Sequence, residues 1–148
     1  MMNNALFSLL FLLFSFAGNA QQTPVTTPTP VDDSSIRKTT EILTEKYTLS
    51  ADQAKQMYKI QARKAQNLAE IAELQNSDPA LYTAKVQNVQ KSTLANIRRI
   101  LQSKEQVEIY QKTQSEQRYL RNQKQKTMVA QKATKAAIDA ALLAIYAE

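Results

Sequence analysis

The chain has 148 residues and a net charge of +6 at pH 7, with 19 lysines and arginines against 13 aspartates and glutamates. It contains no histidine and no cysteine. It therefore lacks the usual general base near neutral pH, a thiolate nucleophile, and the imidazole and thiolate ligands of zinc sites. We expect a protein that is not an enzyme and that uses no cofactor and no metal.

Residues 1–20 have the pattern of a secretory signal peptide. An apolar run from Ala5 to Phe16 is followed by small residues up to Ala20, at the positions that signal peptidase reads. The run is shorter than the roughly 20 residues of a membrane-spanning helix. We expect cleavage after Ala20 and a periplasmic or secreted protein. Residues 21–35 are rich in threonine and proline, which predicts a disordered linker.

The only glycine of the chain, Gly18, lies in the predicted signal peptide. The favoured β-hairpin turns require positive φ angles, so they are difficult to build in the remaining sequence. Apolar residues instead recur at intervals of three and four from Ile36 onward. The predicted fold class is all-α, with antiparallel helical hairpins and about four helices. Residues 36–148 form a single domain in this prediction.

Three helices are predicted before residue 102. The first spans residues 36–47, and the second runs from residue 50 to about residue 75, with Asn76 as its end residue. Asp78 suits the N-cap and Pro79 the first position of a third helix that extends to about residue 101. The connection between the second and third helices is short, which predicts an antiparallel pair.

The fourth predicted helix begins after Ser103 and leads into the alanine-rich segment 127–148. The polar run 121–126 interrupts its apolar pattern. Two arrangements fit this region: one long helix over residues 104–146, or two shorter helices with a bend near residues 121–127.

Two short motifs predict helix starts by the same chemistry. In each, a serine hydroxyl accepts a hydrogen bond from the backbone N–H three residues later, while a glutamine side chain reaches back to the serine N–H. The preceding leucine helps to fix the entry of the chain into the helix. Because the motifs start different helices, we expect the costs of losing the two serines to add. The motif residues are Leu49, Ser50 and Gln53, then Leu101, Ser103 and Gln106.

Positive charge is concentrated in the second half of the chain. Between residues 85 and 126, ten basic residues stand against three acidic ones. Such a surface attracts acidic proteins, lipid headgroups or unfolded chains. We do not expect nucleic acid as the partner of an exported protein. The candidate client-binding residues are Lys85, Lys91, Arg98, Arg99, Lys112, Arg118 and Arg121.

The expected hydrophobic core is small. A domain of about 110 residues whose apolar residues are mostly leucine, isoleucine, valine, alanine and tyrosine buries limited surface. Without cysteine, no disulfide can add stability. We therefore expect self-association, most simply as a homodimer.

The first capping motif, Leu49-Ser50-Ala51-Asp52-Gln53, resembles the repeated Leu-Thr-x-x-Gln motif of the Spy/CpxP family of periplasmic proteins. The second copy carries one inserted residue, Gln102, between its leucine and serine. The resemblance covers residues 36–126 and excludes the alanine-rich segment. It implies a four-helix protomer whose long hairpins form a thin, curved dimer. Its members are ATP-independent chaperones, or dampen envelope-stress signalling by binding a sensor kinase. A branch that binds metals through histidine is not matched, because this chain has none.

Two functions follow from these expectations. The first is an exported holdase-like chaperone that binds unfolded or partly folded envelope proteins through a basic helical surface. The alternative is a structural or regulatory envelope protein that binds one defined partner or the membrane surface through its C-terminal helix. Protection of several unrelated clients would distinguish the first from the second.

Overall fold

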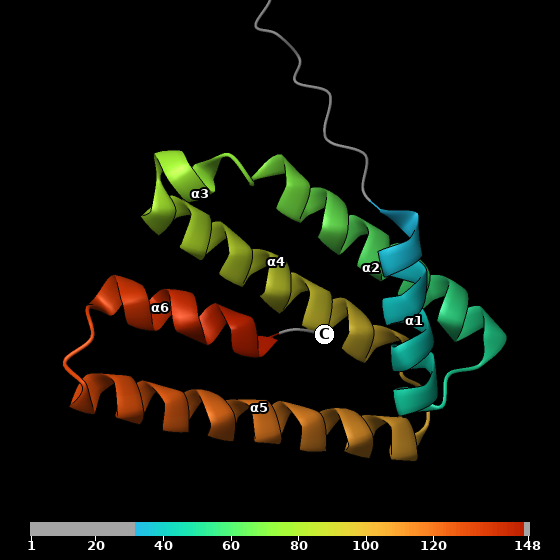
Figure 1. Cartoon of the computed structure of the whole chain (residues 1–148). Coiled ribbons are helices and arrows are strands. Elements are labelled where there is room, and N and C mark those ends of the chain that lie inside the picture. The colour runs from blue at the N-terminus through green and yellow to red at the C-terminus, as the bar shows by residue number, and fades with distance from the viewer. Residues whose placement is uncertain (1–31, 147–148) are drawn as a thin grey trace, which may run out of the picture.

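The computed structural model describes residues 32–146, and every secondary-structure element in that range is helical (Figure 1). This confirms the all-α fold class. The predicted signal peptide and residues 21–31 of the predicted linker lie outside the described residues. The described chain has six α-helices rather than about four, followed by a short 3-10 helix. They are α1 (Asp33–Tyr47), α2 (Ala51–Glu70), α3 (Leu74–Ser77), α4 (Pro79–Ile100), α5 (Lys104–Ala130), α6 (Lys135–Leu143) and η1 (Ala144–Tyr146).

The first helix begins earlier than the sequence suggested. Asp32 is its N-cap, and the carboxylate accepts hydrogen bonds from the amides of Ser34 and Ser35 at 3.0 and 3.2 Å. Aspartate is a strong N-cap because its oxygens satisfy amides that have no partner within the helix. Residues 33–35, which their composition assigns to the linker, therefore belong to α1.

The second helix is shorter than predicted. It ends at Glu70, and a turn at residues 71–73 leads into the four residues of α3. Asn76 lies inside α3 and does not adopt a left-handed conformation, so its predicted role as the end residue is wrong. The chain must leave the helix before Pro79, because the residue preceding a proline is driven out of the α region. Asp78 accordingly lies outside the helical region, with φ −149° and ψ 82°, and its side chain caps α4 by accepting from the Leu81 amide at 3.0 Å.

The predicted bend near residues 121–127 is absent, since α5 continues through this run to Ala130. Arginine, glutamine and lysine are good helix formers, so a polar composition alone does not end a helix. The break comes instead at residues 131–134, where Lys132 has a positive φ of 57° and Thr134 caps α6. The C-terminal region therefore consists of two helices, as in one of the two predicted arrangements, with the break further along the chain.

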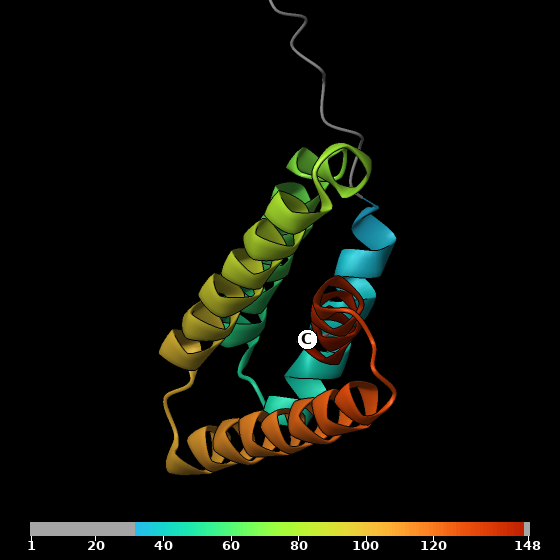
Figure 2. The same cartoon turned by 90° about the vertical axis from the view of Figure 1, so that its left-hand side faces the viewer.

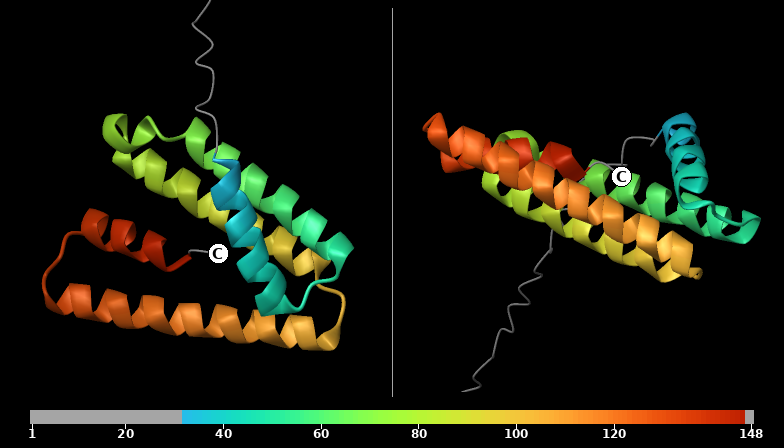
Figure 3. Two further views of the ribbon diagram at one scale, coloured as in Figure 1. Left: turned by 45° about the vertical axis from the view of Figure 1, so that its right-hand side comes forward. Right: turned by 90° about the horizontal axis from the view of Figure 1, so that it is seen from below.

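The helices pack in the order α1 on α2, α2 on α4, and α4 on α6, while α6 also contacts α5. Figure 1 shows α2 and α4 side by side, with α6 between α4 and α5. Turning the molecule shows α5 running across one end of it (Figure 2), and α1 lying against α2 (Figure 3). The start of α5 lies near α1, which it also contacts. Residues from both halves of the chain therefore meet at this end.

The main core cluster lies where α1, α2, α4 and the start of α5 converge. Its buried members are Leu43, Tyr47, Met57, Ile97, Ile100 and Leu101. The Tyr47 and Tyr110 rings are tilted at 44° with centroids 6.4 Å apart, and the Tyr110 hydroxyl donates to the Leu94 carbonyl at 3.1 Å. Away from this cluster, the second half of α5 carries exposed apolar side chains, including Tyr119, Leu120 and Val129. The core is therefore concentrated at one end of the molecule.

Candidate functional site

The two capping motifs lie side by side in the structure. Ser50 caps α2 and Ser103 caps α5, each within a complete capping box. Their glutamines, Gln53 and Gln106, are buried and form a reciprocal amide pair, with both Nε2 to Oε1 distances at 3.0 Å. Of the two leucines, Leu101 is buried in the core and Leu49 packs against it. The motifs thus form one structural junction.

Each glutamine of the junction also binds the backbone beside the other motif. The Gln53 Nε2 donates to the Ile100 carbonyl at 2.7 Å, and the Gln106 Nε2 donates to the Thr48 carbonyl at 3.1 Å. Both amide hydrogens of each side chain are therefore used. Since every polar atom of the pair has a partner, it can be buried without the cost of an unmade hydrogen bond. The junction joins the end of α1 to the end of α4.

The candidate client-binding residues are divided between two helices. The residues Lys85, Lys91, Arg98 and Arg99 are exposed on α4, while Lys112 and Arg118 are exposed and Arg121 is half-buried on α5. One residue turns a helix by about 100°, so the adjacent Arg98 and Arg99 point in different directions. The structure places Arg99 in the groove between α2 and α4, and Arg98 does not line that groove.

Basic side chains do gather in the groove between α2 and α4, which has a volume of about 270 Å³. Its cations are Lys59 and Arg63 from α2 and Arg99 from α4, and its lining includes the apolar side chains of Ile60 and Ile100. No aspartate or glutamate is among its lining residues. We call this feature the basic groove.

The cations of the basic groove are available for a partner. The Arg99 guanidinium donates to the Asn96 amide oxygen at 3.0 Å, which orients it without neutralising it. Within residues 32–146, none of the ion pairs involves Lys59, Arg63 or Arg99. The groove is therefore a positively charged surface with an apolar component, a combination that attracts acidic chains and also contacts their apolar groups.

The sequence-based interpretation missed Lys59 and Arg63, because it followed the excess of charge in the second half of the chain. A signal for them exists in the sequence. Lys55, Lys59 and Arg63 are spaced four residues apart, which aligns them along one side of a helix. That Lys59 and Arg63 lie opposite Arg99 follows only from the packing of α2 against α4.

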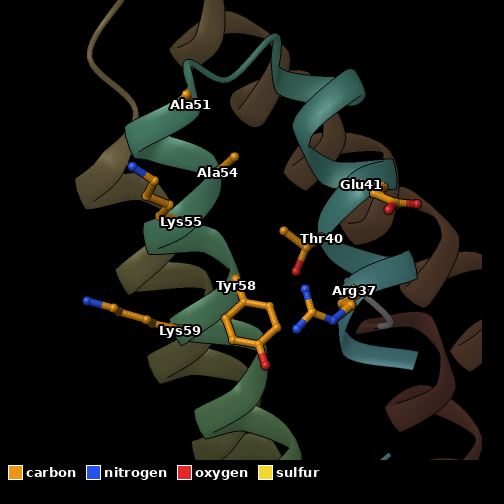
Figure 4. Close-up of a pocket in the computed structure, with 8 residues that line it drawn as sticks. All are labelled: Arg37, Thr40, Glu41, Ala51, Ala54, Lys55, Tyr58 and Lys59. Carbon is orange, nitrogen blue, oxygen red and sulfur yellow. The ribbon is translucent and has the colours of Figure 1, made fainter. Parts of the chain in front are cut away.

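A second groove lies between α1 and α2 and has a volume of about 500 Å³. Figure 4 shows Thr40 and Ala54 pointing toward each other across it, with Arg37 and Tyr58 at its lower end. The side chain of Glu41 points away from the space between the helices in this view. The lining residues are Arg37, Thr40, Glu41, Ala51, Ala54, Lys55, Tyr58 and Lys59.

Asp33 organises the Arg37 end of this second groove. Its carboxylate accepts a hydrogen bond from the Tyr58 hydroxyl, and another from Arg37 Nε at 2.6 Å. These two hydrogen bonds lower the pKa of Asp33, the bond from Tyr58 more than the bond from Arg37. The bond to Asp33 in turn raises the pKa of Tyr58. The Arg37 guanidinium carbon lies 5.4 Å from the centre of the Tyr58 ring, at cation–π distance.

Within residues 32–146, no group of three or more aspartates and glutamates is placed to hold a metal ion. None of the helices in residues 32–146 has the length and apolar character needed to cross a membrane. Comparison with protein-family models, with curated proteins and with solved structures finds no match to this chain.

Proposed function

We propose that this protein is an exported, non-catalytic binding protein that captures acidic, non-native protein segments. The observation that supports the proposal most directly is the basic groove. It places Lys59, Arg63 and Arg99 beside Ile60 and Ile100, with no carboxylate in its lining. Positive charge accelerates encounter with an acidic chain, and apolar contact holds the chain once it has arrived.

The shallow, mixed character of this surface favours holdase-like binding. Lys59, Arg63 and Arg99 are all exposed, and their long side chains can adapt to different sequences. Attraction between exposed charges is modest and is screened by salt, so binding through such a surface is reversible. The Spy/CpxP-like capping motifs and the predicted signal peptide agree with this role in the cell envelope. Hairpin pairing into a homodimer is part of the same proposal.

The test compares aggregation of a chemically unfolded acidic client, followed by light scattering, with and without the purified protein. Replacement of Lys59, Arg63 and Arg99 by glutamine should preserve helicity, because glutamine is nearly as good a helix former as lysine and arginine. It should weaken the protection, most strongly at low ionic strength, where screening is least.

A matched variant controls for the loss of three positive charges. Lys38, Lys124 and Lys126 are exposed, and none of them lines the basic groove. Their replacement by glutamine should leave most of the protection intact. Equal loss in both triple variants would reduce the effect to net charge, and undiminished protection by the groove variant would refute the role of the groove. Protection of only one client would favour the alternative of a single defined envelope partner.

A further inference from the structure

The groove between α1 and α2 has the features of a separate small-ligand site. Its volume of about 500 Å³ lies within the range of pockets that bind small molecules, roughly 300–1,000 Å³. It is larger than the basic groove, and the two share Lys59 as their only common lining residue. Its chemistry differs as well, because it offers a ring, small side chains and one arginine held in place.

The apolar part of the groove is formed by small side chains and an aromatic ring. Ala51 and Ala54 lie along α2, and the side chain of Thr40 faces them from α1 (Figure 4). Tyr58 presents its ring at the lower end of the groove in Figure 4, next to Arg37, and the Tyr58 hydroxyl is engaged by Asp33. Small residues leave room between the two helices, and the ring offers a flat surface for stacking.

Arg37 provides the polar end of the groove. Its Nε is held by Asp33 at 2.6 Å, and its guanidinium lies over the Tyr58 ring. Within the described residues, no hydrogen bond engages its two terminal nitrogens, which lie in the space between α1 and α2 in Figure 4. A guanidinium with two free nitrogens side by side is the preferred partner of a carboxylate, which it binds through two parallel hydrogen bonds.

The charge of the lining also favours an anion. Arg37, Lys55 and Lys59 are its cations, and Glu41 is its single carboxylate. Arg37 pairs with Asp33 through its Nε and Lys55 pairs with Asp52, so Lys59 and the outer face of the Arg37 guanidinium carry the attraction. Figure 4 shows Glu41 directed away from the groove, so it does not occupy the position that an anionic ligand would take. Asp33 is already engaged by two donors, which offsets its repulsion of a second carboxylate.

We propose that the groove between α1 and α2 binds a small aromatic carboxylic acid, with its carboxylate on the terminal nitrogens of Arg37 and its ring against Tyr58 and Ala54. This proposal is independent of the capture of acidic chains by the basic groove. It assigns Arg37 to ligand recognition rather than to stabilisation of α1.

The test is a titration of the purified protein with phenylbutyrate, followed by the NMR shifts of backbone amides and of the Arg37 side chain. We expect shifts at residues that line the groove. Phenylbutanol, which has the ring without the carboxylate, and butyrate, which has the carboxylate without the ring, should each bind about tenfold more weakly, the equivalent of about 1.4 kcal/mol. This comparison requires no variant, so it does not depend on the folding of one.

Variants locate the site. Arg37→Gln should weaken phenylbutyrate binding about tenfold, by removing a charge-assisted contact worth about 1.4 kcal/mol. Ala54→Leu should also weaken it, by filling the groove. Lys38→Gln removes a charge from the neighbouring position, which does not line the groove, and should leave the affinity unchanged. Equal affinity for phenylbutanol, unchanged affinity in both groove variants, or shifts confined to α5 and α6 would overturn the proposal.

Discussion

The amide pair of Gln53 and Gln106 connects parts of the chain that are 53 residues apart. Each side chain closes the capping box of its own helix and binds the backbone next to the other helix. A buried amide is costly when a partner is lost, because its remaining groups keep their desolvation penalty. These two residues therefore combine a local function in capping with a tertiary function in joining the ends of α1 and α4.

Replacing either Gln53 or Gln106 by methionine should lower the free energy of unfolding by about 2 kcal/mol, since partners of the lost amide remain buried and unsatisfied. The double variant should cost less than the sum of the two, because it removes both members of the pair. Chemical denaturation of the four proteins in a double-mutant cycle measures this coupling.

An exposed glutamine serves as the control for the amide pair. Gln111 is exposed on α5, so Gln111→Met should change the free energy of unfolding by less than about 0.5 kcal/mol. Strict additivity of the Gln53 and Gln106 variants would show that the reciprocal hydrogen bonds do not contribute to stability.

The contact between Asp33 and Tyr58 predicts a pH dependence at both ends of the scale. The lowered pKa of Asp33 means that its contribution to stability is complete above its ordinary pKa of about 3.9 and is lost as the pH falls through the lower value in the folded protein. The raised pKa of Tyr58 means that its contribution is complete below about pH 10 and is lost as the pH rises through the higher value.

Asp33→Asn should therefore bring the pKa of Tyr58 down toward its ordinary value, because the charged acceptor that favours the neutral phenol is removed. NMR titration of the Tyr58 ring resonances measures the change. Asp52→Asn removes a carboxylate that pairs with Lys55 instead and should leave Tyr58 unaffected. A Tyr58 pKa that is the same in the Asp33 variant and the native protein would contradict the contact.

At the level of the helices, the capping boxes at Ser50 and Ser103 belong to one hydrogen-bond network. Ser50→Ala or Ser103→Ala should each cost about 1 kcal/mol of stability, by removing an N-cap acceptor. From the sequence we expected the two costs to add. The structure changes this expectation, because the boxes share the Gln53–Gln106 pair, and residues of one hydrogen-bond network are coupled.

The double serine variant should therefore be more stable than the sum predicts, by about 0.5 kcal/mol or more. Thermal and chemical unfolding of the single and double variants provide the measurement. Thr134→Ala removes a cap from α6, outside the junction, and its cost in stability should add to that of either serine variant. Melting curves of both single variants identical to the native curve would refute the capping role itself.

Two helices, α1 and α5, are each followed by a residue other than glycine in the left-handed conformation. Thr48 and Lys132 have φ angles of 49° and 57°, and each is followed by an amide that bonds back across the last turn of α1 or α5, to Thr44 at 2.9 Å and to Met128 at 3.0 Å. This is the Schellman arrangement, in which glycine is the preferred residue because side chains destabilise the left-handed conformation.

Lys132→Gly should therefore stabilise the protein by about 0.5 to 1 kcal/mol, because the relief of the left-handed conformation exceeds the entropy that glycine adds to the unfolded chain. Lys126→Gly is the matched control. It lies within α5, where glycine should instead cost about 1 kcal/mol. Effects of the same sign in both variants, measured by thermal unfolding, would show that the conformation of Lys132 is not a source of strain.

At the level of the whole molecule, the uneven core favours self-association. The buried cluster lies at one end, whereas Tyr119 and Leu120 on α5 are 63% and 54% exposed and line a shallow groove of about 440 Å³ with Ser115 and Glu116. We predict a homodimer in which α5 is covered, so the melting temperature should rise with protein concentration. Sedimentation equilibrium should give the mass of two chains.

Replacement of Tyr119 and Leu120 by serine should shift the equilibrium toward the monomer. Ile42, which is 56% exposed on α1, offers a control of similar exposure, and Ile42→Ser should leave association unchanged. A monomer at all concentrations, with a constant melting temperature, would contradict the prediction of a homodimer.

Local chemistry allowed the sequence by itself to determine the fold class and several helix starts. The serine at position 50, the serine at position 103 and the Asp78-Pro79 pair act within one turn, so their effects can be read without knowing the rest of the molecule. The location of the break before α6 was not predictable in the same way, because the polar run 121–126 and the turn at 131–134 differ in backbone conformation more than in composition.

Tertiary packing alone decided which of these residues meet. Repeated capping motifs predict two similar helix starts but not the buried pair of Gln53 and Gln106, since their contact depends on how four helices converge. The basic groove likewise combines Lys59 and Arg63 with Arg99, although sequence charge pointed to the second half of the chain. Helical periodicity assigns a side chain to a face, and only the packing of α1, α2 and α4 determines what that face is placed against.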